Sequence, residues 1–135
     1  MRQLNAIRAV GAALIGVAMT CTVSVAHADI KDYEFQLIDQ TVEAGPDKII
    51  TVRLVNKTTG KPVPDAVIFA IRLDMAPDGM AEMSEPIDQL SSTEPGVYRF
   101  KAAVVMPGGW RLLLGAKVQG EAGTVQSELE FRATP

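Results

Sequence analysis

Apolar and polar residues alternate along most of the chain beyond residue 32. Because successive side chains of a strand point to opposite faces, a period of two predicts strands with one buried face and one solvent-facing side. Polar neighbours such as Arg72 and Asp74 are then expected on the solvent face. The apolar positions form six groups: Tyr33, Phe35 and Leu37; Ile50, Val52 and Leu54; Val67, Phe69, Ile71 and Leu73; Tyr98, Phe100, Ala102 and Val104; Trp110, Leu112, Leu114, Ala116 and Val118; and Val125, Leu129 and Phe131.

Glycine and proline residues mark turns between these groups, at residues 44–47, 56–64, 94–96, 107–109 and 120–123. Glycine adopts the backbone conformations with positive φ that turns require, and proline lacks the backbone N–H that a strand would use as a hydrogen-bond donor, so both residues end strands. A seventh, short strand is predicted around residues 87–91, and no segment carries a sustained helical period. The spacing is typical of a single all-β domain, an antiparallel Ig-like β-sandwich of about seven strands.

Residues 1–28 have a different pattern. Arg2 and Arg8 precede an apolar run at residues 9–19, and the segment ends in Ala26-His27-Ala28. This order predicts a helical signal peptide that is cleaved after Ala28, leaving residues 29–135 as a periplasmic domain. An uncleaved membrane anchor is the alternative, because residues 8–28 are just long enough to span a bilayer. Lipidation at Cys21 is disfavoured because the usual leucine three positions earlier is missing.

Composition narrows the chemistry that such a domain can perform. With 13 basic and 16 acidic residues the chain has a net charge of −3, so a nucleic-acid partner is not expected. A single Cys and a single His exclude internal disulfides, Cys zinc sites and His-pair metal motifs. Both residues leave with the predicted signal peptide. The mature domain is therefore not expected to be an enzyme, and no catalytic residue is assigned.

Methionine is the one side chain whose distribution suggests chemistry. Met75, Met80 and Met83 lie in the predicted loop of residues 74–87, and Met106 directly precedes Pro107-Gly108-Gly109-Trp110. Thioether sulfur is a soft ligand that suits Cu(I) or Ag(I). The spacing in a flexible loop allows several sulfurs to converge on one ion. The indole of Trp110 could lie against such an ion as a cation–π contact.

Other interpretations of these residues stay open. Methionine also fills gaps in cores, so the loop could cap the open end of the sandwich. A methionine-rich surface could instead bind a partner protein. Trp110 begins an inward-facing stripe, which favours core packing for its side chain. The acidic residues of the segment lack the ligand order of a calcium loop and are interpreted as a solvated, solubilising loop; they are Asp74, Asp78, Glu82 and Glu85.

Three short motifs together carry a resemblance to a known family. They are RLDMAPDGMAEM at residues 72–83, EPGVY at residues 94–98 and MPGGW at residues 106–110. In this order they resemble the FixH-like/YtkA-like family of small exported bacterial β-sandwich domains. The resemblance implies a periplasmic Ig-like fold and a role in copper or heavy-metal handling. The positions that match the family pattern are Met75, Met80, Met83, Met106 and Trp110.

The chain departs from that family in two respects. Many relatives carry a histidine in the methionine-rich loop, whereas residues 29–135 contain none. A site built from thioethers alone would favour Cu(I) or Ag(I) over Cu(II) or Zn(II). The FixH branch also keeps its N-terminal helix as an anchor, so the Ala26-His27-Ala28 ending favours the YtkA-like side.

Three functional hypotheses follow. The first is a non-enzymatic periplasmic accessory protein of copper or heavy-metal homeostasis that binds Cu(I) or Ag(I). The second is a metal-free interaction module that docks onto a metal-efflux or respiratory-oxidase assembly complex. An enzyme is the third and weakest hypothesis, since it would need a cleft with paired carboxylates of perturbed pKa.

Overall fold

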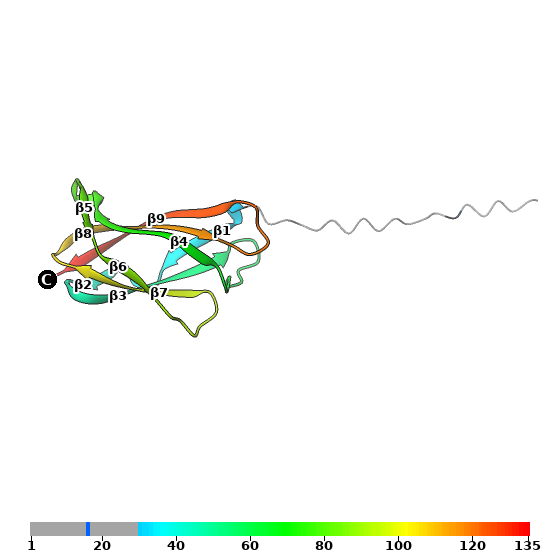
Figure 1. The fold of residues 1–135 in the computed structure, drawn as a ribbon, viewed down its shortest axis with the longest axis horizontal. Coiled ribbons are helices and arrows are strands. Elements are labelled where there is room, and N and C mark those ends of the chain that lie inside the picture. Colours follow the sequence, from blue (N-terminus) through cyan, green and yellow to red (C-terminus); the bar gives the residue numbers. More distant parts are fainter. Residues whose placement is uncertain (1–15, 17–29) are drawn as a thin grey trace, which may run out of the picture.

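The computed structural model describes residue 16 and residues 30–135, which form two β-sheets packed face to face (Figure 1). The predicted signal peptide and its cleavage after Ala28 lie outside the described residues. No helix among the residues described is both long and apolar enough to cross a membrane. The predicted all-β sandwich is confirmed.

Sheet A has the strand order β1-β3-β7-β6 and sheet B the order β2-β9-β8-β4-β5. Neighbouring strands are antiparallel except for β2 and β9, which run parallel. The strands are β1 (Tyr33–Leu37), β2 (Thr41–Glu43), β3 (Gly45–Asn56), β4 (Val67–Met75), β5 (Met80–Glu85), β6 (Ile87–Leu90), β7 (Val97–Val104), β8 (Gly108–Lys117) and β9 (Thr124–Thr134); two 3-10 turns are η1 (Ile30–Asp32) and η2 (Ala76–Asp78).

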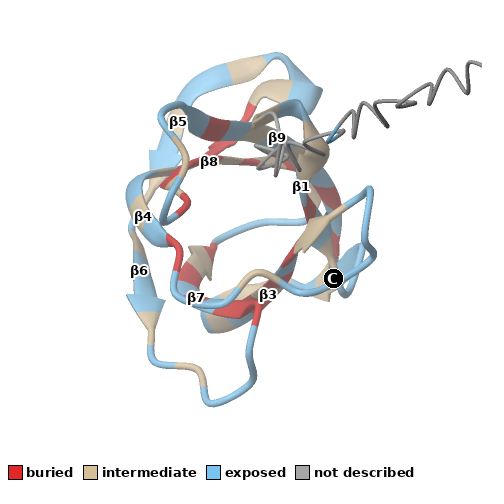
Figure 2. Ribbon diagram, turned by 90° about the vertical axis from the view of Figure 1, so that its right-hand side faces the viewer, coloured by how far each residue is buried: buried red, intermediate tan, exposed pale blue. Residues whose placement is uncertain are grey.

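The core lies between the two sheets and contains most of the alternating apolar positions predicted from the sequence. The end-on view of Figure 2 shows buried positions on strands of both layers. Trp110, Phe35 and Phe100 are its largest members, each exposed by no more than 2%. Burial of one such side chain stabilises the fold by about 1.5–3 kcal/mol. All six strong strands and the short strand β6 are confirmed.

Strands β2 and β5 were not predicted. Strand β2 has three residues, too few to show a period. Strand β5 occupies residues predicted to be a loop, so that prediction is wrong. Only three of its positions pair with β4, and the register shifts between Asp74 and Met75, which obscures the alternation in the sequence.

Strand β4 also corrects the predicted burial pattern. Val67 and Phe69, expected on the buried face, are 58% and 56% exposed. A β-bulge between Ile68 and Ala70 shifts the register against β8, so Ile68 packs against the core instead. Asp74, expected on the solvent face, is fully buried.

Two ends of the sandwich are important for function. We call the region formed by residues 74–83 and 105–110 the hairpin end; Figure 1 shows β5 at the same end of the sandwich as the C-terminus. We call the opposite region, formed by residues 56–66 and 94–98, the tyrosine end. The three motifs noted above divide between them, because residues 72–83 and 106–110 meet at the hairpin end and residues 94–98 lie at the tyrosine end.

Candidate functional site: the hairpin end

The methionine-rich segment folds into a tight β-hairpin. Strand β4 ends at Met75, and the 3-10 turn Ala76–Asp78 reverses the chain with a proline in its first turn. Gly79 then adopts a left-handed conformation with φ of 75°, which glycine accepts without strain. Strand β5 begins at Met80, directly opposite Met75.

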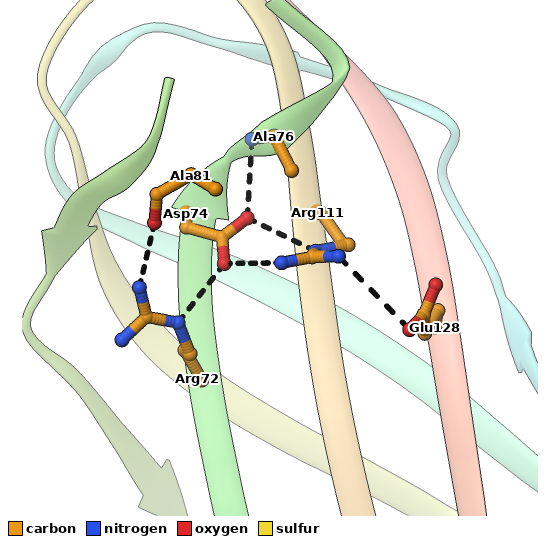
Figure 3. Close-up of polar contacts among 6 residues, drawn as sticks. All are labelled: Arg72, Asp74, Ala76, Ala81, Arg111 and Glu128. Atoms are coloured by element: carbon orange, nitrogen blue, oxygen red, sulfur yellow. Dashed lines mark hydrogen bonds and ion pairs between the residues drawn. The ribbon is translucent and has the colours of Figure 1, made fainter. Parts of the chain in front are cut away.

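A buried carboxylate holds the base of this hairpin (Figure 3). Asp74 Oδ1 accepts hydrogen bonds from the backbone N–H of Ala76 at 3.1 Å and from Arg111 Nε at 3.0 Å. Asp74 Oδ2 accepts from Arg111 Nη2 at 2.8 Å and from Arg72 Nε at 3.0 Å. Arg72 Nη2 also donates to the carbonyl of Ala81 at 2.7 Å, which ties β5 to the cluster. The carboxylate therefore joins β4, β8 and the hairpin.

These contacts determine the charge state of Asp74. The hydrogen bonds from Arg111 lower the pKa of the Asp74 carboxyl, and those from Ala76 and Arg72 add to this effect against the opposing effect of burial. The same pair raises the pKa of Arg111. Two guanidinium groups thus neutralise the carboxylate. The interpretation of residues 74–85 as a solvated acidic loop is wrong for Asp74, which is a buried structural anion.

The second acidic residue of the hairpin joins it to the β7–β8 turn. Asp78 Oδ2 accepts a hydrogen bond from the backbone N–H of Gly109 at 3.1 Å. A Cβ at Gly108 would collide with Asp78 Oδ2 and lie 2.9 Å from Met75 Cε, so only glycine fits at this position. The methionine-rich motif and the MPGGW motif are therefore packed against each other.

The predicted metal ligands occupy different depths at this end. Met75 is fully buried, Met80 and Met83 are half-buried against the core, and Met106 is 38% exposed. Cβ atoms of directly opposed cross-strand residues such as Met75 and Met80 lie about 4.5–5.5 Å apart. The Met75 methyl contacts the turn that carries Met106. Met83 lies on β5 inside the interval over which the register shifts, between Met80, which pairs with Met75, and Ser84, which pairs with Asp74.

Trp110 is a core residue at the base of the same turn. Its side chain is fully buried, and its indole Nε1 donates to the carbonyl of Met106 at 3.1 Å. This agrees with the core-packing interpretation of the sequence. The indole has no face open to solvent, so its direct role here is to fix the turn that presents Met106.

Among the described residues, no three Asp, Glu, His or Cys side chains gather closely enough to hold a metal ion. A metal at the hairpin end would therefore rely on the thioethers.

Sequence reasoning missed two buried polar residues that order the ends. Asp74 was one, although Arg72 and Asp74 share a strand face and Arg111 is expected on the corresponding face of β8. Tyr98 was the other. Its hydroxyl donates to the carbonyl of Val63 at 2.8 Å and accepts from the N–H of Ala66 at 2.9 Å, which pins the β3–β4 connection at the tyrosine end.

Known proteins provide three comparisons: with solved structures, with curated sequences and with family sequence models. Among solved structures, a conjugative transposon lipoprotein from Bacteroides eggerthii is similar, with 12% identity, a TM-score of 0.35, and coverage of 74% of this chain and 96% of that chain. No curated protein sequence matches the chain. The sequence model of the YtkA-like family matches residues 27–115, a range that contains all three motifs. The chain therefore belongs to the YtkA-like family.

Proposed function

We propose that this protein is a non-enzymatic, exported accessory protein of copper or heavy-metal homeostasis that binds Cu(I) or Ag(I) at the hairpin end. The observation that carries the proposal is the cross-strand pair of Met75 and Met80, in which the Met75 methyl group lies against Gly108 in the turn that carries Met106. The signal-like N-terminus and the family membership support export to the periplasm.

The chemistry of the donors supports a soft monovalent ion. Thioethers are neutral, so they need no deprotonation and favour Cu(I) or Ag(I) over harder divalent ions. The buried Met75 would exclude water from one side of the ion. Met106, the most exposed of the four, would be the first sulfur to meet an incoming ion and the last to leave it. The difference in exposure between Met75 and Met106 suits a protein that captures an ion and transfers it to an acceptor by exchange of ligands.

A second candidate function is a metal-free interaction module that docks onto a metal-efflux or oxidase-assembly protein. The complete burial of Met75 favours it, because that side chain also serves as ordinary core packing. In this case the methionines cap the sandwich, and Val105 and Met106, 52% and 38% exposed, provide an apolar contact surface for the partner.

Competition for Cu(I) separates the two functions. Protein expressed from the full sequence with the change Cys21→Ser, so that no thiol competes for the ion, is titrated against a chromogenic Cu(I) chelator, with Ag(I) as a second probe. The metal function predicts that wild-type protein withdraws Cu(I) from the chelator and that the triple variant Met75→Leu/Met80→Leu/Met106→Leu does not. Leucine is close in volume, so each change should cost less than about 1.5 kcal/mol of stability.

Met83→Leu is measured as a separate single-site variant, because Met83 lies between Met80 and Ser84 on β5 and is a further candidate ligand. Urea unfolding of every variant verifies that the hairpin end still folds. Equal competition by the wild type and the folded triple variant would exclude the thioether site. A lack of competition by the wild type would favour the interaction module.

A further inference from the structure

The outer face of sheet B carries apolar side chains that the fold does not cover. The bulge in β4 leaves Val67 and Phe69 58% and 56% exposed. Leu113 of β8 is half-buried on the same face, since its register partners are the outward-facing Arg72 and Glu128. Exposed apolar groups that gather on one sheet face are typical of an interaction surface.

A hollow lies beside the exposed phenylalanine. Gly115 of β8 lacks a side chain, and the Phe69 ring lies over it, so that a Cβ at Gly115 would be 3.0 Å from ring atoms Cε2 and Cζ. The hollow has a volume of about 460 Å³ and is open to solvent. Its outward-facing lining includes Phe69, Arg72, Leu113, Gly115, Gln126 and Glu128.

The charged residues around the hollow form a pattern that is complementary to the same pattern on a second copy of the chain. Arg72 on β4 and Glu128 on β9 flank Leu113 on β8, and their side chains are 45% and 68% exposed. Neighbouring strands lie about 4.8 Å apart. This row therefore presents a positive, an apolar and a negative side chain in turn on three adjacent strands. A two-fold axis along β8 would place each Arg72 over the other copy's Glu128 and Leu113 over Leu113.

The same rotation also brings the neighbouring rows together, and Lys117, in the row beyond Gly115, would face its counterpart. Each Phe69 ring, which covers Gly115 of its own chain, would meet the other copy's Phe69 ring near the two-fold axis, above the two Gly115 residues. Arg111, the next outward residue along β8, would lie near its counterpart on the axis, and the carboxylates of Asp74 and Glu130 that flank it in the same row would offset the two positive charges.

We propose that the outer face of sheet B is a homodimer interface in which a second copy of this chain packs sheet against sheet. Phe69 is the anchor in the centre, and two Arg72–Glu128 pairs form the rim. Buried aromatic anchors supply most of the affinity of such interfaces, while rim charges set the register. We expect a weak dimer with a dissociation constant in the micromolar range, because one face of a short sheet offers a contact at the small end of protein interfaces.

Sedimentation velocity of the full chain over a concentration series tests the proposal. The wild type should pass from monomer to dimer, and Phe69→Asp should stay monomeric. Ile49→Asp is the matched control, because Ile49 is 41% exposed on the outer face of sheet A, and this variant should still dimerise. Glu128→Lys should weaken the dimer about tenfold by placing like charges together, whereas the same change at Glu34 on sheet A should not.

Three results would overturn the proposal. One is a wild type that stays monomeric up to about 1 mM, well above the expected dissociation constant. The second is a dimer that Phe69→Asp and Ile49→Asp disturb equally, which would place the contact elsewhere. The third is a monomer that carries a small apolar molecule, detected by native mass spectrometry, which the Phe69→Asp variant no longer binds. This result would show that the hollow is a ligand site and not a dimer contact.

Discussion

The two ends of the sandwich are each held by one buried polar side chain, but the two anchors differ in charge. At the hairpin end Asp74 is an anion enclosed by two arginines, while at the tyrosine end Tyr98 uses a neutral hydroxyl to bridge Val63 and Ala66. The methionines gather at the charged end, and the segments of the tyrosine end contain none. The comparison shows that the region proposed to bind metal depends on an ion-pair network that pH can disturb.

Removal of the Asp74 charge should produce the largest effect. Asp74→Asn keeps the shape of the side chain but leaves two guanidinium groups without their counter-ion. We expect a loss of about 3 kcal/mol in the free energy of unfolding, measured by urea denaturation. Asp88→Asn, an exposed carboxylate on β6, is the control and should change stability by less than about 0.5 kcal/mol. Equal losses in the two variants would contradict the anchoring role of Asp74.

Removal of the Tyr98 hydroxyl should have a smaller effect. Tyr98→Phe leaves the backbone N–H of Ala66 without its partner in a buried position. The expected loss is about 1–2 kcal/mol in the same measurement. Tyr33→Phe removes a half-buried hydroxyl that bonds Glu121 at 3.1 Å, and it should cost about 0.5 kcal/mol. If both variants were equally stable, the hydroxyl of Tyr98 would not hold the tyrosine end.

The response to pH should distinguish the two anchors. Because the pKa of Asp74 is lowered in the folded state, its stabilisation is complete above the unfolded value of about 3.9 and is lost as the pH falls toward the folded value. Burial raises the pKa of Tyr98, so its stabilisation is complete below about pH 10 and is lost as the pH rises further.

The urea concentration at the unfolding midpoint, measured from acid to alkaline pH, checks both predicted losses of stability. Asp74→Asn should reduce the loss of stability at acid pH and leave the loss of stability at alkaline pH unchanged. Tyr98→Phe should leave the loss of stability at acid pH unchanged and reduce the loss of stability at alkaline pH. An acid profile that is the same in wild type and Asp74→Asn would contradict the lowered pKa.

The fold was predictable wherever the period of two was unbroken, as in β7 and β8. The strand β4 was predicted, but its buried face was not, because the bulge at Ile68–Ala70 turns Phe69 outward without changing the apolar pattern. The burial of Asp74 depends on Arg111, a residue 37 positions later that reaches it only across a sheet. The methionine cluster could be suspected from composition, but the cross-strand pairing of Met75 with Met80 required the hairpin geometry.

The central claim is that thioethers of the hairpin end bind one soft metal ion together. The most direct test is a titration of the full chain, labelled with ¹³C at the methionine methyl groups, with Ag(I) followed by NMR. Met→Leu variants assign the resonances of Met75, Met80, Met83 and Met106. We predict that the methyl signals of Met75, Met80 and Met106 shift together and saturate at one ion per chain. Unchanged signals of Met75 and Met80 in folded protein, or an unsaturating shift of Met106 alone, would contradict the claim.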